Sequence, residues 1–134
     1  MSRKFKVSRS VIVALLAVLV LAVGCGTSKE VNLDANDDGS QVEIEKGQTL
    51  VIALEASPTT GYTWEAVELD EHILRQVGEP EFEPQSDAVG APGIQTIRFE
   101  AVGAGQTTLR LGYRRPWEED VEPVETFSIQ VVVR

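Results

Sequence analysis

Residues 50–64 read LVIALEASPTTGYTW, and this stretch holds two strand-like runs joined by a short connection. The first run is apolar, and the second alternates aromatic or apolar side chains with polar ones, as strands do. In the connection, Pro58 fixes its own φ and Gly61 accepts backbone conformations that a side chain resists. Thr59 and Thr60 are β-branched and therefore restricted at χ1. The stretch predicts two strands and a stiff loop, which is either a plain turn or a surface held ready for a partner.

The same alternation recurs along the chain after residue 41, without a sustained helical period. Short runs with apolar side chains at every second position are separated by turns rich in glycine and acidic residues. Such runs indicate strands whose inward faces share one core. We therefore predict an all-β fold, an immunoglobulin-like antiparallel β-sandwich of about seven to eight strands. The best-defined strands are expected at 49–55, 62–67, 73–79, 94–101, 107–113 and 124–133.

The connections between these strands fall into two groups. In an antiparallel sandwich each connection reverses the chain, so alternate connections emerge at the same end. The loops at 57–61, 81–93 and 114–123 are therefore expected together at one end. Loops gathered at the end of a rigid sandwich are how immunoglobulin-like folds build binding sites.

The N-terminus has the features of a targeting segment. Four cationic residues precede an unbroken apolar run of 13 residues at 11–23, which is shorter than the roughly 20 residues needed to span a bilayer. Residues 21–25 read LAVGC and resemble a bacterial lipobox, in which the cysteine, here Cys25, is acylated and becomes the mature N-terminus. An ordinary cleaved signal or an uncleaved anchor is the alternative.

We expect a lipoprotein signal peptide at 1–24, a lipidated tether at 25–30 and a β-sandwich domain at 31–134. Cys25 is the only cysteine, so the domain has no internal disulfide. The resemblance to bacterial lipoproteins implies several acyl chains on Cys25, and two already anchor a protein stably. The expected location is the cell envelope, lipid-anchored and extracytoplasmic.

Charge and composition narrow the function. The net charge is −9, and removal of the four cationic residues of the signal leaves −13. An acidic domain does not bind nucleic acid by phosphate neutralisation, nor does it adsorb to anionic lipid. No cluster of His and Cys offers a metal site, and no cofactor is expected. His72, the one histidine, lies in an acidic turn away from any nucleophile, so the chain is not expected to be an enzyme.

Residues 34–45 fit the EF-hand pattern D-x-[DN]-x-[DN]-G-x5-E. A calcium loop needs helices on both sides, whereas the flanks 31–33 and 42–45 alternate like strands. Asn, Asp and Gly between strands are also what a hairpin turn needs. We therefore predict a hairpin turn rather than a calcium site.

Three segments, in this order and spacing, resemble the chagasin family of cysteine-protease inhibitors. Residues 58–62 (PTTGY) match the family's first loop, Gly90 and Gly93 match its glycine-rich second loop, and residues 115–117 (RPW) match its third. The resemblance extends over about 42–133. Two positions depart from the family pattern, Ser57 standing for Asn in the first loop and Pro92 for a common Gly in the second.

The resemblance implies tight, reversible inhibition of papain-like cysteine proteases by a monomer whose three loops occlude the active-site cleft. Thr59 and Thr60 would lie near the catalytic Cys and His of the protease, and the second loop would approach by its backbone. Trp117 would be an aromatic anchor, and Arg115 would pair with a partner carboxylate. The implied contact residues are Pro58, Thr59, Thr60, Gly61, Gly90, Gly93, Arg115, Pro116 and Trp117.

Individual residues have plainer interpretations. Trp117 is alternatively a loop residue folded back on the sandwich, and Arg115 alternatively pairs with Glu118 or Glu119. Trp64 is expected to be buried in its strand, and Tyr113 to support the core or the loops.

Two other functions fit a lipid-anchored sandwich. One is an immunoglobulin-like adhesion or assembly module that binds a surface partner other than a protease, and the other is a structural envelope lipoprotein. Neither gives a reason for the PTTGY and RPW segments to occur together.

Overall fold

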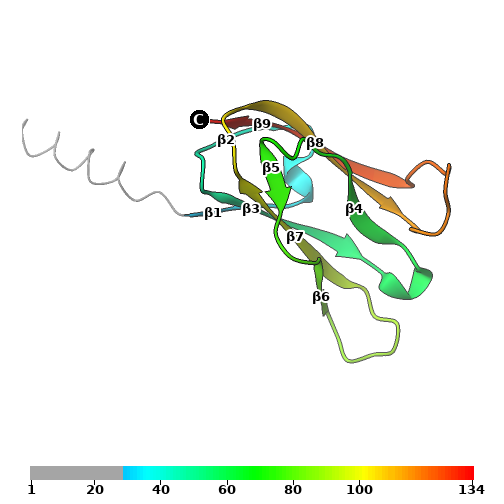
Figure 1. Ribbon diagram of the computed structural model, residues 1–134. Helices are drawn as coiled ribbons and strands as arrows, with labels where there is room; N and C mark the ends of the chain where they lie inside the picture. Colours follow the sequence, from blue (N-terminus) through cyan, green and yellow to red (C-terminus); the bar gives the residue numbers. More distant parts are fainter. Residues whose placement is uncertain (1–28) are drawn as a thin grey trace, which may run out of the picture.

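The computed structural model describes residues 29–134, which form nine strands in two facing sheets (Figure 1). Two single 3₁₀ turns, η1 (Ala35–Asp37) and η2 (Pro58–Thr60), lie between strands. The strands are β1 (Glu30–Leu33), β2 (Gln41–Ile44), β3 (Thr49–Ala56), β4 (Thr63–Glu68), β5 (Leu74–Gln76), β6 (Glu81–Pro84), β7 (Gly93–Ala101), β8 (Gly105–Arg114) and β9 (Glu125–Val133).

The predicted β-sandwich is confirmed. One sheet has the order β1-β3-β7-β5, with β6 also paired to β7, and the other has the order β2-β9-β8-β4. Both sheets are mixed, because the first strand of each pairs in parallel, β1 with β3 and β2 with β9. All other pairings are antiparallel, as predicted.

Strict alternation builds the core. Along β7, every second residue from Gly93 to Ala101 is buried, and β9 buries four residues in the same way. Phe99 and Phe127 are among the largest fully buried side chains. Burying one such side chain stabilises the fold by about 1.5–3 kcal/mol. The buried core and all strands of residues 29–134 lie within 30–133, so residues 26–134 contain this core and its two sheets entire.

A buried polar side chain joins the two sheets beneath one end of the sandwich. Gln95 of β7 donates from Nε2 to the carbonyl oxygen of Trp64 at 2.8 Å, and its Oε1 accepts from the Trp64 backbone N–H at 3.0 Å. Its Oε1 also accepts from the hydroxyl of Thr63 at 3.2 Å. The start of β4 is therefore fixed against β7.

The hairpin predicted at 34–40 is wrong, because this segment crosses from one sheet to the other. Asp34 caps η1 by accepting from Asn36 N–H, and the Asp34 N–H donates to Asp37, each at 2.9 Å. Asp38 accepts from Ser128 N–H of β9 at 2.8 Å. The acidic side chains therefore satisfy backbone donors at the crossing. Within 29–134, no three side chains of metal-ligand type gather.

The predicted loop at 81–93 contains a strand. β6 pairs antiparallel with the start of β7, from Glu81 opposite Thr96 to Pro84 opposite Gly93. The loop proper is therefore residues 85–92, closed by a bond from Gln85 N–H to Pro92 O at 3.0 Å. The four residues of β6 are all exposed, so this edge strand contributes no side chain to the buried core.

The start of β1 and the C-terminus lie away from the loops at 57–62, 85–92 and 115–124. Glu30 of β1 is opposite Thr49, the first residue of β3, and β3 then runs the length of the sheet toward residue 57. Figure 1 shows the start of β1 and the C-terminus at the end opposite these loops. The predicted signal peptide and Cys25 lie outside the described residues. Among residues 29–134, no helix is long and apolar enough to span a bilayer.

Candidate functional site

Three loops meet at one end of the sandwich (Figure 1), as the alternation of connections predicts. The β3–β4 loop (57–62) lies between the other two. On one side, a Cβ placed on Gly90 of the β6–β7 loop would lie 3.8 Å from the Thr59 side chain. On the other, Arg115 of the β8–β9 loop donates from Nε to the carbonyl oxygen of Thr60 at 3.0 Å. The three predicted site segments, which are spread along the chain between residues 58 and 117, are therefore adjacent in space.

The β3–β4 loop is a single tight turn. Thr60 N–H donates to Ser57 O at 3.1 Å, and Gly61 N–H donates to Pro58 O at 2.9 Å. The hydroxyl of Thr60 also donates to Ser57 O, at 2.6 Å. Pro58, Thr59 and Thr60 are all exposed. The loop thus projects as a compact convex wedge with its two threonines at the surface.

Ser57, the departure in the first loop, makes no side-chain cap. The loop is held at this point through the backbone instead, because Ser57 N–H donates to the Tyr113 hydroxyl at 2.9 Å. Tyr113 in turn stacks on Tyr62 and on Trp64, with ring centroids 5.4 Å and 5.1 Å apart. The predicted supporting role of Tyr113 is confirmed, whereas nothing in the sequence distinguishes Tyr62 as part of this stack.

Trp64 is buried, as predicted, with 5% of its surface exposed. Its Nε1–H donates to the carbonyl oxygen of Glu55 in the facing sheet at 2.9 Å. The wedge is therefore mounted on an aromatic column that reaches the core.

The β8–β9 loop brings Arg115 and Trp117 beside the wedge. Trp117 remains 68% exposed, and its ring lies against Gly61. Arg115 pairs with Glu118 at 3.3 Å, and its guanidinium lies 4.5 Å above the Tyr62 ring. Pro116, between them, is exposed. Trp117 is thus a large exposed aromatic side chain held on a supported loop.

The β6–β7 loop presents one of its two predicted glycines. Gly90 has φ +77°, follows Val89 in a turn closed by Ala91 N–H on Ala88 O at 3.1 Å, and is exposed beside Thr59. Gly93 is buried at the start of β7, where a Cβ would collide with the Glu83 carbonyl. The structure therefore does not bring Gly93 to the surface, and this glycine is needed for the close packing of β6.

Gly61 is where conformation and packing both require glycine. Its φ is +84°, and a Cβ there would collide with Cη2 of Trp117. We expect Gly61→Ala to cost about 1–2 kcal/mol of stability through backbone strain. It also displaces Trp117, so the protease inhibition that the sequence leads us to expect should fall further than stability does.

Urea unfolding and inhibition of the same protein preparation measure the two effects. Gly47→Ala is the matched control, since Gly47 also has positive φ (+97°) but has open space around it, in the turn before β3. Equal loss of inhibition in both variants would contradict this role for Gly61.

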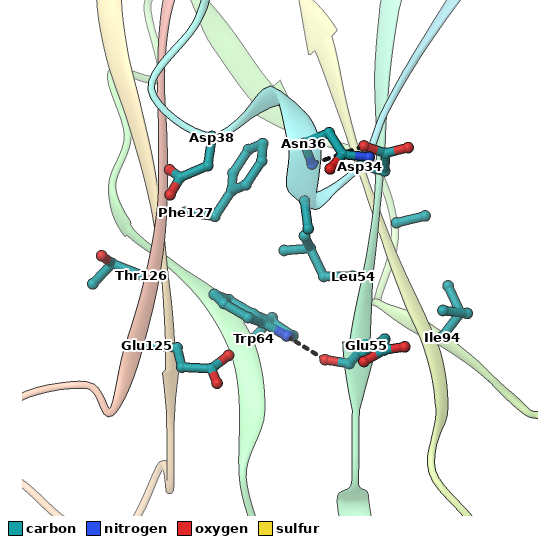
Figure 2. Close-up of a pocket in the computed structure, with 12 residues that line it drawn as sticks. Asp34, Asn36, Asp38, Leu54, Glu55, Trp64, Ile94, Glu125, Thr126 and Phe127 are labelled. Atoms are coloured by element: carbon teal, nitrogen blue, oxygen red, sulfur yellow. Dashed lines mark hydrogen bonds between the residues drawn. The ribbon is translucent and has the colours of Figure 1, made fainter.

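A cleft of about 380 Å³ opens on one side of the sandwich, and Figure 2 draws the residues that line it. It lies between η1, β3 and β9, with Leu54, Trp64 and Phe127 along its apolar wall. None of the predicted contact residues lines it. The candidate site is instead the convex surface made by the three loops.

Comparisons with known proteins agree with this geometry. The model of the family described as chagasin family peptidase inhibitor matches residues 43–131, a segment that includes all three loops. Amoebiasin-2 of Entamoeba histolytica is 32% identical over 108 residues, which is 76% of this chain and 84% of that protein.

Two solved structures share the fold. The crystal structure of the cysteine protease inhibitor EhICP2 from Entamoeba histolytica has a TM-score of 0.68 and 29% identity, covering 78% of this chain and 96% of that one. PbICP-C, solved in complex with falcipain-2, has a TM-score of 0.54 at 16% identity, covering 80% of this chain and 100% of that one. At this identity, the second likeness supports the fold alone.

The family match spans most of the described chain, and the family is described as one of peptidase inhibitors. EhICP2 is likewise described as an inhibitor. The chain therefore belongs to the chagasin family of peptidase inhibitors.

Proposed function

We propose that this protein inhibits papain-like cysteine proteases tightly and reversibly, as a monomer, by placing its three loops over the active-site cleft. The observation that carries the proposal is the convex wedge of Pro58, Thr59 and Thr60, flanked by one loop on each side. Such a surface complements a long groove. EhICP2, the structural relative at 29% identity, is itself described as a cysteine protease inhibitor.

The wedge suits occlusion better than cleavage. A substrate lies extended along a protease cleft, whereas residues 58–60 form a 3₁₀ turn. The Thr60 N–H and hydroxyl both bond back to Ser57 O, which prevents the turn from opening. The peptide bonds of the wedge are therefore out of line for nucleophilic attack, since catalysis requires a near-attack geometry. The turn is already ordered, so binding costs little conformational entropy.

The flanking loops have different parts in the proposed complex. At the β6–β7 loop, Gly90 carries no side chain, so the backbone can approach the partner closely. At the β8–β9 loop, Trp117 is large, exposed and supported, which is the character of an interface hot spot. The two loops would rest on the two rims of the cleft while the wedge fills its centre.

The direct test is titration of papain and a cathepsin-L-like protease with residues 26–134, following hydrolysis of a small fluorogenic substrate. We expect reversible inhibition at nanomolar concentration, with the domain recovered uncleaved. Absence of inhibition of both proteases by a folded domain would overturn the proposal, and an adhesion or assembly module would then be the better account.

We also propose that Cys25 carries lipid and holds the domain in the cell envelope on the extracytoplasmic side. The support is the lipobox-like segment 21–25 and the position of β1, which begins at the end opposite the three loops. A short tether from Cys25 would therefore leave the loops facing away from the membrane.

Replacing Cys25 with serine tests the anchor. In a bacterial host, we expect the unchanged protein in the membrane fraction and labelled by a radioactive or alkyne-tagged fatty acid. Cys25→Ser should not acquire the label and should no longer be processed as a lipoprotein. A variant that retains the label, or an unchanged protein that never acquires it, would contradict lipidation at this residue.

A further inference from the structure

We infer that Arg115 acts from inside the inhibitor, as a clasp that joins the β8–β9 loop to the wedge and fixes the position of Thr60. It is a positioning residue, and the contact with the protease from this loop falls to Trp117. The inference deepens the proposed function, because it assigns Arg115 a role other than pairing with a partner carboxylate.

The contacts of Arg115 are directed into its own molecule. Nε–H donates to Thr60 O at 3.0 Å, and the terminal nitrogen Nη1 donates to Glu118 at 3.3 Å. The guanidinium carbon Cζ lies 4.5 Å from the centre of the Tyr62 ring. Two of the three guanidinium nitrogens are thus engaged within the molecule, the group lies over an aromatic ring, and 37% of the side chain is exposed. These contacts commit Nε and Nη1 to the inhibitor itself.

Alternate residues of one segment hold the wedge at three points. Tyr113 accepts from Ser57 N–H at the start of the loop, Arg115 holds Thr60 O in its middle, and Trp117 covers Gly61 at its end. Arg114, between them, turns the other way and bonds to Glu65 and the backbone of Glu118.

Of these three residues, Arg115 is the one that contacts the exposed part of the wedge. Thr60 O receives this bond, while the Thr60 N–H and hydroxyl hold the 3₁₀ turn through Ser57. Loss of the clasp would therefore leave the turn closed through Ser57 but free it to move relative to the β8–β9 loop, with the sandwich intact. A wedge that must be ordered on binding gives a faster-dissociating complex.

The chemistry requires arginine. A guanidinium offers donors in a fixed planar fork and stacks on an aromatic face, whereas a lysine ammonium is a single compact charge. Lysine at 115 would keep the charge but could not bond to both Thr60 O and Glu118 from a planar group lying over Tyr62. Arg115→Lys therefore separates the clasp from the charge.

The test compares Arg115→Ala and Arg115→Lys with Arg110→Ala in residues 26–134. Arg110 is an exposed arginine on β8, the strand that leads into the loop of Arg115, so its removal changes the net charge as Arg115→Ala does. The first measurement uses the free protein and needs no protease. NMR order parameters of Thr59, Thr60 and Gly61 should fall from the rigid value of about 0.85 toward the flexible range below about 0.6 in both Arg115 variants.

The order parameters of β7 and β9 in the Arg115 variants, and all order parameters of Arg110→Ala, should equal those of the protein without substitutions.

The second measurement is the dissociation rate of the papain complex. We expect it to rise by about tenfold or more for both Arg115 variants, since a charge-assisted hydrogen bond and a cation–π contact are lost. The association rate should match that of Arg110→Ala.

Two results would overturn the clasp. One is a wedge that stays rigid in both Arg115 variants, whatever happens to inhibition. The other is full rescue of the dissociation rate by Arg115→Lys, which would show that charge alone acts on the partner. If the unchanged protein does not inhibit papain, the proposed function fails, but the order parameters still decide whether Arg115 holds the wedge.

Discussion

Trp64→Ala is expected to lower the free energy of unfolding by about 3–5 kcal/mol, the cost of removing a large aromatic side chain from a packed core. Trp64 is buried, stacks on Tyr113 and donates from Nε1 to Glu55 O in the facing sheet. Small domains have only about 5–15 kcal/mol of stability, so this single change removes a large part of it. Urea unfolding followed by far-UV circular dichroism measures the loss.

Inhibition should fall together with stability in Trp64→Ala, because the aromatic column beneath the wedge is lost. A loss of less than about 1 kcal/mol would contradict the burial and cross-sheet bonding described for Trp64.

Trp117→Ala is expected to have the opposite profile. The indole is 68% exposed, so its removal should change the free energy of unfolding by no more than about 0.5 kcal/mol. As an interface hot spot it should contribute at least about 2 kcal/mol to binding, which is roughly a 30-fold rise in the inhibition constant for papain. The same preparations used for Trp64→Ala provide both measurements.

The two tryptophans are thus matched controls for each other, since the same side chain is removed in both. If Trp117→Ala unfolds the domain, Trp117 is structural and the assignment of the third loop is wrong. If both stability and inhibition are unchanged, the β8–β9 loop makes no important contact with the protease.

The strands and the meeting of the three loops could be predicted from the sequence because they depend on alternation alone. A run such as 93–101 buries every second side chain, and the direction of each connection then follows from geometry. The crossing at 34–40 could not be predicted in this way. Asp and Asn cap a 3₁₀ turn and form a hairpin equally well, and only the pairing partners of β1 and β2 distinguish the two.

The edge strand β6 and the directions of individual side chains could not be predicted from the sequence either. β6 reads EFEP and alternates, but it has only four residues, all exposed, with prolines at 80 and 84, and proline within a run argues against a strand. Gly93 and Gly90 look alike in sequence, yet one is buried under β6 and the other is exposed beside Thr59.

The sequence leaves the direction of Arg115 open between a partner carboxylate and Glu118 or Glu119 of its own loop. The structure shows it turned toward Glu118 and Thr60, a contact 55 residues away that no local pattern reports. Local sequence therefore fixes which residues are available, and the tertiary structure fixes which way they face.

The most direct test of the central claim is binding to papain with its cleft free and with its cleft blocked. Papain whose catalytic cysteine carries a covalent peptidyl inhibitor keeps its surface but has no open groove. Isothermal titration calorimetry of residues 26–134 should show tight one-to-one binding to free papain and none to the blocked enzyme. Equal affinity for both forms would contradict occlusion of the cleft by the three loops.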